Sequence, residues 1–408
     1  MTLSLDTEPA CPGTEPDAAR IRDASTPAGR RLRADRRPFD SIAPETWDAL
    51  VAVNPWATPF SLHAYHRAWW DAYRETAMDE TLVVVDPDAA ADAPLVGIVP
   101  LMHRHEVEPT DAERQTRLRH GSEAELTVVA PDAKAIFFGA SYHADYATLL
   151  AAPDDLPAVA EATVARLAEW AAGGEGAPAP WDVVDLRRLR CGDPSADVLA
   201  AAFGRREMTE GWTLNVERED VCPVVRLPDG VDFDGYLALL GKKDRHEIRR
   251  KLRRAEAHGE VRLVESADPI ADLDAFIELH QKRWRELGLF PPTPGGAASR
   301  VFFRRLFELL GPPGIVHLAF LMVGDRRIAA GVHLETDDAY LYYNAGIDPD
   351  ARELSPGVVM IAKYIERAIA SGKHRIDFLR GDESYKYQWG AVDEPIQRLL
   401  VRRQPSET

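Results

Sequence analysis

The sequence predicts a mixed α/β fold, with a mainly antiparallel sheet flanked by helices, built as two similar halves in tandem. Its 408 residues are enough for two or three domains with real cores. Residues 316–347 alternate between β-rich runs and short polar turns, a pattern typical of an antiparallel meander. Two helix-then-strand units end in the similar segments WDVVDLRRL and HRIDFLRG, which indicates an internal duplication.

Residues 1–38 form the first segment. They lack apolar periodicity and contain an arginine-rich run, so we expect a disordered basic arm. The N-terminus has no basic and apolar leader, and no stretch of about 20 apolar residues occurs. We therefore expect a cytoplasmic protein without a transmembrane segment.

The first expected domain covers residues 39–212. Tyr65, Trp69 and Tyr73 recur at helical spacing, which predicts a helix with a buried aromatic stripe. A hairpin, a helix closed by glycine and a β-rich strand follow; they are predicted over residues 81–104, 156–173 and 181–189.

The second expected domain covers residues 213–403. Amphipathic helices are predicted at residues 242–256 and 276–284, and the Pro- and Gly-rich segment 290–299 is predicted to be a mobile loop. After the meander, a helix is expected from Val358, followed by a strand over residues 374–381. This order of elements repeats that of the first domain.

The segment Arg352–Gly357 is the first candidate site. Ser355 is a favoured N-cap residue, Pro356 suits the first helical position, and Gly357 leaves the backbone open to a ligand. Free N–H groups and the helix dipole attract anions, and Arg352 adds a cation. The alternative is a well-capped helix that binds nothing.

The segment Phe378–Trp389 is the second candidate, because it collects acidic, basic and phenolic groups just after a predicted buried strand. A tyrosine can donate a proton to a leaving group, and a carboxylate can accept one from an amine. Lys386 can hold an anion or polarise a carbonyl group. The alternative is a polar surface loop with ordinary ion pairs.

The predicted helix over residues 242–256 is the third candidate. It carries eight cations against three anions in a chain whose formal net charge is −17. That overall charge argues against non-specific nucleic-acid binding by the whole chain, so a polyanion would need this local patch. The patch residues are Lys242, Lys243, Arg245, Arg249 and Arg250. A simple solvated face is the alternative.

Together, KKDRHEIRRKLRRAE, the Arg283-Trp284 pair, the meander, the Ser-Pro-Gly helix start and IDFLRGDESYKYQW resemble the GNAT acyltransferase superfamily. The most similar branch holds FemAB-type aminoacyltransferases and CelD-like proteins linked to cellulose synthesis. The resemblance covers residues 215–400 well and 40–210 more weakly. It implies tandem GNAT-like domains, of which the first is degenerate.

The resemblance implies direct transfer of an acyl group from acetyl-CoA or another acyl-CoA to a primary amine, without a metal. The donor pyrophosphate would rest on Arg352, Ser355, Gly357 and Val358, although Ser355 and Pro356 stand where the family pattern has glycine. Tyr385 would be the proton donor, with Tyr387 as second choice, and Glu383 or Asp382 the base. The predicted substrate contacts are Arg380, Lys386, Trp389, Tyr342 and Asn344.

The acceptor is expected to be a small molecule, a sugar amine or a peptide. Two alternatives stay open. In one, an aminoacyl-tRNA is the donor and its RNA backbone lies against the basic helix. In the other, the tandem fold has lost catalysis and serves as a component of polysaccharide or envelope synthesis.

Overall fold

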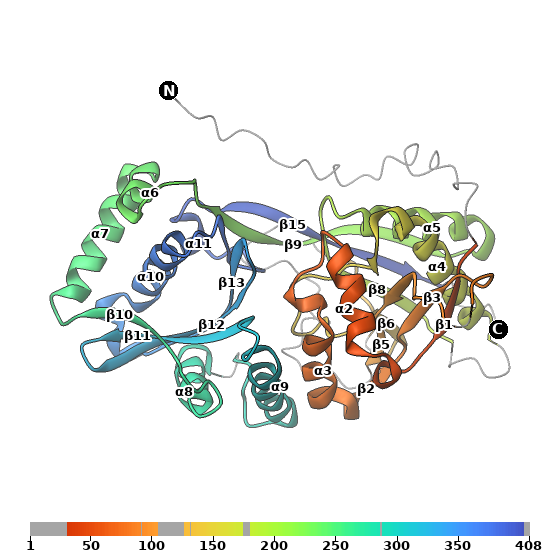
Figure 1. Cartoon of the computed structure of the whole chain (residues 1–408), viewed down its shortest axis with the longest axis horizontal. Helices are drawn as coiled ribbons and strands as arrows, with labels where there is room; N and C mark the ends of the chain where they lie inside the picture. Colours follow the sequence, from red (N-terminus) through yellow and green to blue (C-terminus); the bar gives the residue numbers. More distant parts are fainter. Residues whose placement is uncertain are drawn as a thin grey trace.

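The residues described by the computed structural model are 31–90, 92–104, 126–130, 132–173, 180–285 and 288–403. Two halves lie side by side, and two long strands run through both of them (Figure 1). The strands of the first half are β1 (Arg33–Arg36), β2 (Ala77–Asp79), β3 (Leu82–Val85), β4 (Gly97–Val99), β5 (Leu101–Arg104), β6 (Ala135–Phe138), β7 (Leu150–Ala151) and β8 (Val183–Arg190). Its helices are α2 (Pro44–Val53), α3 (His63–Tyr73), α4 (Leu156–Ala172) and α5 (Pro194–Glu210).

The second half continues from β9 (Thr213–Arg226), the first of the two long strands. Its other strands are β10 (Val261–Glu265), β11 (Val316–Val323), β12 (Arg326–Glu335), β13 (Ala339–Ile347), β14 (Arg375–Asp377) and β15 (Val392–Arg402). The helices are α6 (Phe233–Leu239), α7 (Lys242–Glu256), α8 (Leu273–Trp284), α9 (Pro294–Leu310), α10 (Pro356–Ala370) and α11 (Ser384–Tyr387).

An eleven-stranded sheet joins the halves in the order β10-β11-β12-β13-β14-β9-β15-β8-β6-β5-β2, and a four-stranded sheet, β1-β3-β4-β7, completes the first half. The predicted meander is confirmed, because β11, β12 and β13 pair antiparallel. The duplication is visible in the topology. In each half one parallel pair, β6 with β8 or β13 with β14, is connected through a helix, α4 or α10.

The two long strands connect the halves. β9 follows β8 in the chain yet pairs with β14 of the second half, while β15, the last strand, pairs with β8 of the first half. The two long strands also pair with each other over most of their length. The division at residues 212 and 213 remains our proposal for where the duplicated units meet in the chain.

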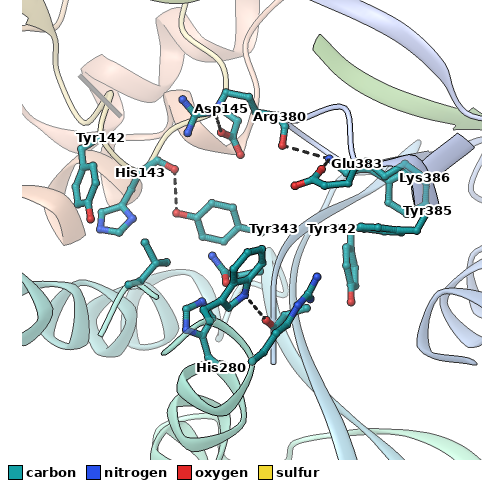
Figure 2. Close-up of a pocket in the computed structure, with 16 residues that line it drawn as sticks. Tyr142, His143, Asp145, His280, Tyr342, Tyr343, Arg380, Glu383, Tyr385 and Lys386 are labelled. Atoms are coloured by element: carbon teal, nitrogen blue, oxygen red, sulfur yellow. Dashed lines mark hydrogen bonds and ion pairs between the residues drawn. The ribbon is translucent and has the colours of Figure 1, made fainter. Parts of the chain in front are cut away.

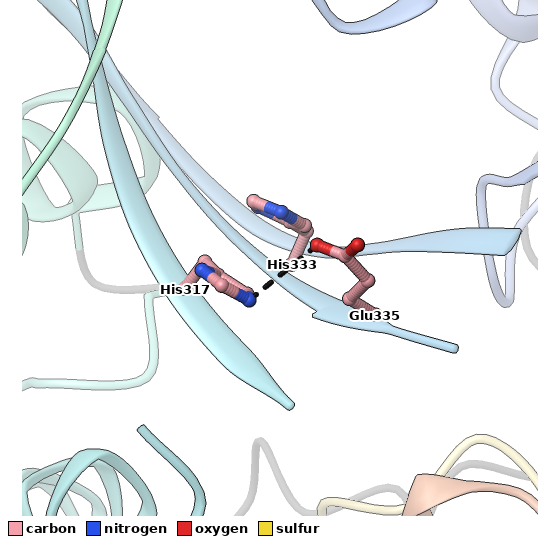
Figure 3. Close-up of side chains that lie close together, drawn as sticks. All are labelled: His317, His333 and Glu335. Atoms are coloured by element: carbon pink, nitrogen blue, oxygen red, sulfur yellow. Dashed lines mark ion pairs between the residues drawn. The ribbon is translucent and has the colours of Figure 1, made fainter. Parts of the chain in front are cut away.

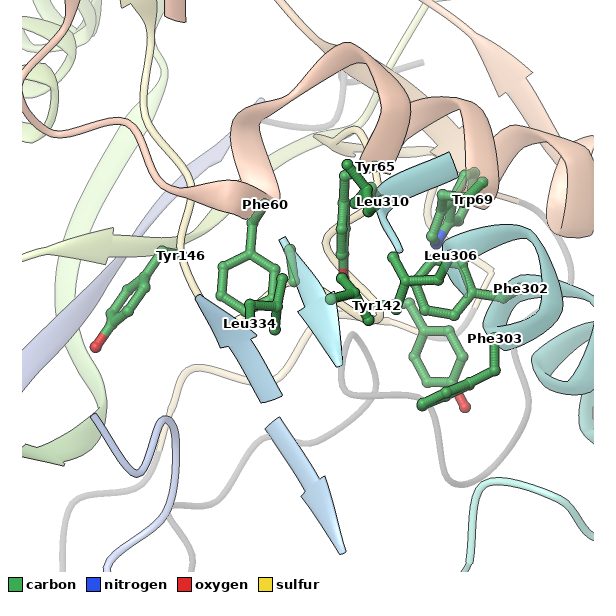
Figure 4. Close-up of a cluster of buried hydrophobic side chains, with 14 of the residues drawn as sticks. Phe60, Tyr65, Trp69, Tyr142, Tyr146, Phe302, Phe303, Leu306, Leu310 and Leu334 are labelled. Atoms are coloured by element: carbon green, nitrogen blue, oxygen red, sulfur yellow. The ribbon is translucent and has the colours of Figure 1, made fainter. Parts of the chain in front are cut away.

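A shared aromatic core fixes the two halves against each other (Figure 4). Phe302 on α9 packs edge-to-face on Tyr65 of α3, with ring centroids 5.5 Å apart, and stacks on His143 at 4.2 Å. The hydroxyl of Tyr73 on α3 lies 2.7 Å from His143 Nε2 and 3.0 Å from Ser299 Oγ. The predicted stripe on α3 is therefore buried, as expected, and it forms part of the contact between the halves.

Two predictions are corrected here. Residues 33–36 of the expected arm form β1 and pair with β3, because Ala34 is buried in the core and Arg36 forms an ion pair with Glu80 at 2.8 Å. Residues 1–30 lie outside the described part of the chain. The predicted mobile loop 290–299 is wrong from Pro294 onward, where α9 begins under a Thr293 side chain that accepts a hydrogen bond from Gly296 N.

Candidate active site

The candidate site lies where the neighbouring strands β13 and β14 separate. The two strands pair in parallel only over Ala339–Leu341 and Arg375–Asp377. Beyond Asp377 the chain turns away, with Leu379 and Gly381 at positive φ angles of 55° and 111°. Asp377 holds this turn, because its Oδ1 accepts a hydrogen bond from Leu379 N at 2.9 Å. A gap therefore opens between β13 and the segment after β14.

A cavity of about 190 Å³ fills this gap (Figure 2). Its walls come from four segments of the chain: the loop after β6, the end of α8 with the residues that follow it, β13 and the segment after β14. In that order they contribute Tyr142, His143 and Asp145; His280, Arg283, Trp284 and Leu289; Tyr342, Tyr343, Asn344 and Ala345; Phe378, Arg380, Glu383, Tyr385 and Lys386. Six of the sequence-predicted site residues are thus brought together.

The first half closes one side of the cavity by polar contacts. Arg380 Nε lies 3.3 Å from Asp145 Oδ1, and the Tyr343 hydroxyl donates a hydrogen bond to the His143 carbonyl at 2.9 Å. Arg380 thus meets a carboxylate of the first half of the chain, and Figure 2 shows both residues at the rim between the halves. A single GNAT-like unit could not form this cavity wall.

Lys386 lies in the cavity wall, but its ammonium group is engaged in the fold. Nζ donates hydrogen bonds to the carbonyls of Leu379, Arg380 and Gly381 at 3.1, 3.2 and 2.7 Å, and it pairs with Glu383 Oε2 at 2.9 Å. The side chain is 3% exposed. The structure therefore corrects the expectation that Lys386 holds substrate, since its donors already hold the loop.

Tyr385 faces the cavity beside Arg283 and Tyr342. Burial raises the pKa of the Tyr385 phenol, while a hydrogen bond from Arg283 acts in the opposite direction. Burial also raises the pKa of Tyr342. Both phenols are consequently protonated at neutral pH, and each can donate a proton or a hydrogen bond.

Arg283 is a site residue that was not among the sequence-predicted substrate contacts. Its guanidinium lies 4.6 Å from the centre of the Trp284 ring, and no carboxylate of the described residues lies within ion-pair distance of it. The other two cations of the cavity wall, Arg380 and Lys386, each face a carboxylate. The wall thus carries one cation without a carboxylate partner, which favours a ligand with a negative group.

His280 is a second residue that the sequence analysis missed. Burial lowers its pKa to about 4, so the imidazole is neutral at pH 7, and it forms hydrogen bonds with Gln281 and Asn344. A neutral ring beside Asn344 offers a hydrogen-bonding wall without charge. The signal available in the sequence was the position of His280 three residues before Arg283, on the same side of a predicted helix.

Three other predicted residues lie away from the cavity. Trp389 is 1% exposed and packs in the core, which corrects its assignment as a substrate contact. Asp382 does not line the cavity wall, and the Tyr387 hydroxyl donates instead to Asp393 Oδ1 at 2.7 Å. Of the two carboxylates predicted as the base, Glu383 is therefore the one that lines the same cavity as Tyr385.

The predicted donor turn forms the start of α10. Ser355 is the N-cap residue with φ 54° and ψ 52°, and its side chain makes no capping hydrogen bond. Val358 N and Val359 N both donate to Ser355 O. Since Pro356 has no N–H, Gly357 supplies the free amide of this turn among the described residues, and exposed Arg352 lies beside it.

The basic helix is α7, with the bounds predicted. Lys242 and Lys243 are exposed, whereas Arg249 pairs with Asp234 at 2.9 Å and Arg250 with Glu247 at 2.6 Å. Arg245 donates to the carbonyl of Ala238. The free charge of this patch is therefore concentrated at the start of the helix.

α7 also reaches the donor turn at its other end. Arg254 donates a hydrogen bond to the carbonyl of Glu353, 3.0 Å away, in the 3₁₀ helix that leads into α10. The basic helix and the predicted donor turn are therefore neighbours in the fold.

Comparison with known proteins identifies the family of one domain of this chain and structures with a similar fold. Residues 242–387 match the family described as acetyltransferase (GNAT) domain. FemX is similar in structure, with a TM-score of 0.52 and 10% identity over 87% of this chain and 96% of that chain. No curated protein matches the sequence significantly.

A second similar structure is a conserved protein of unknown function from Bacteroides thetaiotaomicron VPI-5482. Its TM-score is 0.50 and its identity 12%, over 89% of this chain and 98% of that chain. At such identities the likeness shows the fold alone. Residues 242–387 are a GNAT domain, so the predicted family resemblance is confirmed for this part of the chain. The mixed α/β fold is confirmed as well, and its duplication is seen in the parallel strand pair of each half. No helix among the described residues is both long and apolar enough to cross a membrane.

Proposed function

We propose that this protein is an N-acyltransferase that moves an acyl group from acyl-CoA to a primary amine. The observation that carries the proposal is the cavity at the parting of β13 and β14, lined by protonated Tyr385 and by the Arg283 cation. The start of α10, where the donor pyrophosphate is expected, follows β13 in the chain. The reacting carbonyl would then lie between the two strands.

In the proposed reaction the amine nitrogen attacks the thioester carbonyl, a C–N bond forms and the C–S bond breaks. Glu383 accepts the proton that the amine loses, and the Tyr385 hydroxyl gives its proton to the leaving thiolate. Tyr342 and Asn344 orient the acceptor from the β13 side. Arg283 binds a negative group, so we propose an acceptor that carries a carboxylate or phosphate besides its amine.

Isothermal titration with CoA and acetyl-CoA at low salt tests the donor site. Micromolar binding is expected, and Arg352→Glu should weaken it by about 1 to 3 kcal/mol, because a charge-assisted contact becomes a repulsion. Arg304→Glu, at an exposed position of α9, is the matched control and should leave affinity unchanged. Equal affinity in Arg352→Glu and wild type would remove the donor from this turn.

An acyl-transfer assay with a panel of amines, in which the release of free thiol is measured, tests the proton donor. Tyr385→Phe should lower kcat and leave acetyl-CoA affinity unchanged, since the ring that lines the cavity is kept and the hydroxyl is lost. An unchanged kcat would exclude Tyr385 as proton donor.

A second candidate function uses aminoacyl-tRNA as the donor. It is favoured by the exposed Lys242 and Lys243 on a helix whose other end contacts Glu353 next to the donor turn. If CoA does not bind, a tRNA titration with Lys242→Glu and Lys243→Glu tests this donor, with a loss of affinity expected. If neither donor binds, the non-catalytic component of polysaccharide or envelope synthesis is the better account.

A further inference from the structure

Three metal-ligating side chains meet on strands β11 and β12, and none of them lines the cavity (Figure 3). His317 of β11 stands opposite His333 of β12 in the antiparallel register, and Glu335 follows two residues later on the same face. Their ligand atoms all lie within 4.8 Å of one another. The imidazole rings are stacked, with centroids 4.9 Å apart and an interplanar angle of 14°.

His333 provides an independent sign of a missing partner. It is completely buried, and its Nε2 has no hydrogen-bond partner. Its Nδ1 lies 3.2 Å from the Tyr364 hydroxyl, which itself donates to Gly331 O. The tyrosine oxygen is then the acceptor for Nδ1–H, so Nε2 carries a buried lone pair that nothing satisfies. An unmet buried polar atom of this kind needs an explanation.

His317 is oriented in a complementary way. Its Nδ1 bonds to the Glu265 carboxylate, and its Nε2 lies 3.5 Å from Glu335 Oε2. A histidine that gives one ring N–H to a carboxylate and directs the other nitrogen to a metal is the usual arrangement around protein-bound zinc. Nε2 also lies 2.9 Å from Gly314 O, a contact that uses a proton and that a metal ion would replace.

Neighbouring side chains occupy all but one of the carboxylate oxygens of Glu265 and Glu335 beside the two histidines, so one oxygen is left to bind a metal ion. Glu335 Oε1 faces Lys373 Nζ at 2.8 Å, and the second oxygen of Glu265 faces Arg367. Glu335 Oε2 is thus the oxygen on the histidine side. Glu335 and His317 are 24% and 16% exposed, so an ion can reach the group from solvent.

We propose that His317, His333 and Glu335 bind one divalent transition-metal ion of the zinc class. Two imidazole nitrogens and one carboxylate oxygen form a donor set that zinc prefers, with a fourth position left for water. Zinc bonds are about 2.0 to 2.2 Å long, so the three ligand atoms must move closer together than they are. Rotation of the half-buried Glu335 side chain can bring its carboxylate oxygen closer. Such an ion would link β11 to β12 and, through Glu265 and Tyr364, to β10 and α10.

This proposal departs from the expectation of no metal. The zinc motif H-E-x-x-H places its two histidines on one helix, whereas here a His-x-Glu pair lies on a strand and the third ligand comes from the neighbouring strand. The site is independent of the proposed acyl transfer, because no residue of the cavity belongs to it.

The test is a titration of the chelator-treated full chain with Zn²⁺, in competition with a chromophoric chelator. We expect one equivalent bound and a higher melting temperature in the metal-bound protein. His317→Gln and Glu335→Gln should each weaken binding by about tenfold or more, with circular dichroism spectra unchanged. Both positions are partly exposed, so these variants are expected to fold.

His374→Gln is the matched control. His374 also contacts two carboxylates, Asp229 at 3.0 Å and Asp338 at 2.8 Å, but through opposite ring nitrogens. This substitution should leave Zn²⁺ affinity unchanged. Co²⁺ loaded into the wild-type chain should give a visible spectrum typical of a tetrahedral site. Absence of stoichiometric binding, or equal affinity in the His317→Gln and wild-type chains, would overturn the proposal.

Discussion

The loop after β14 should depend for its stability on the buried ammonium group of Lys386. That group donates to the carbonyls of Leu379, Arg380 and Gly381 and pairs with Glu383. Lys386→Met keeps the length and apolar stem of the side chain and removes every one of these contacts. Three carbonyl groups and one carboxylate would lose their donor.

The expected cost follows from the burial of these groups. Removing one partner of a buried ion pair costs about 3 to 5 kcal/mol, because the other groups lose their partner without regaining water. With an m-value of about 3 kcal/mol per M in urea, the unfolding midpoint should fall by about 1 M or more. Equilibrium urea unfolding, followed by tryptophan fluorescence and by circular dichroism, measures this change.

Lys282→Met is the matched control for this experiment. Lys282 pairs with Glu278 at 2.7 Å on the surface of α8 and is 44% exposed. An exposed pair of this type contributes about 0.5 kcal/mol or less, so the control should unfold near the wild-type midpoint. If Lys386→Met did the same, the ammonium group would not hold the loop, and its role as a substrate contact would be restored.

Three further predictions concern the frame around the site. Burial raises the pKa of Glu80 from 4.5 to about 7. The folded protein therefore holds a proton on Glu80 more tightly than the unfolded chain does. This stabilises the fold fully below pH 4.5, and the stabilisation is lost as the pH rises through 7. Glu80→Gln should therefore be more stable than wild type at pH 8, by up to about 3 kcal/mol, and this difference should shrink toward pH 4.5. Thermal melts over this pH range measure the difference, and equal pH profiles for the two proteins would contradict the prediction. Phe302→Ala should cost about 3 to 5 kcal/mol in urea unfolding, because the ring is fully buried between the halves, and a loss below about 1 kcal/mol would contradict its role there. A double-mutant cycle with Asp145→Asn and Arg380→Gln should give a coupling energy of about 0.5 to 3 kcal/mol, and a value near zero would show that the pair does not join the halves.

The helices and strands of this protein follow closely from local patterns. The basic helix occupies Lys242–Glu256, as its apolar spacing predicts, and the three strands of the meander and the helix after it are observed. The similar segments WDVVDLRRL and HRIDFLRG also indicated that the helix-and-strand unit occurs twice. These features depend on the period of buried residues along a short segment, which a single sequence records.

Errors arose where tertiary packing decided between local alternatives. Glycine and proline in residues 290–299 favoured a loop, yet Thr293 caps a helix there because Phe302 and Phe303 pack between the halves. The Thr-Pro pair was a helix-start signal in its own right. Residues 33–36 were predicted to be part of a charged arm. In the structure they form an edge strand of the four-stranded sheet, and Ala34 between the charged residues is buried.

By itself the sequence determined the period of each element, the family resemblance and six of the residues that line the cavity. Only the tertiary structure decided that Arg283 and Asp145 belong to the same site, that Lys386 serves the loop and that Trp389 is core. The physical reason is that burial along one segment leaves a periodic trace in that segment. A cavity lined by both halves depends on contacts between residues hundreds of positions apart, such as Asp145 and Arg380, and no local period records them.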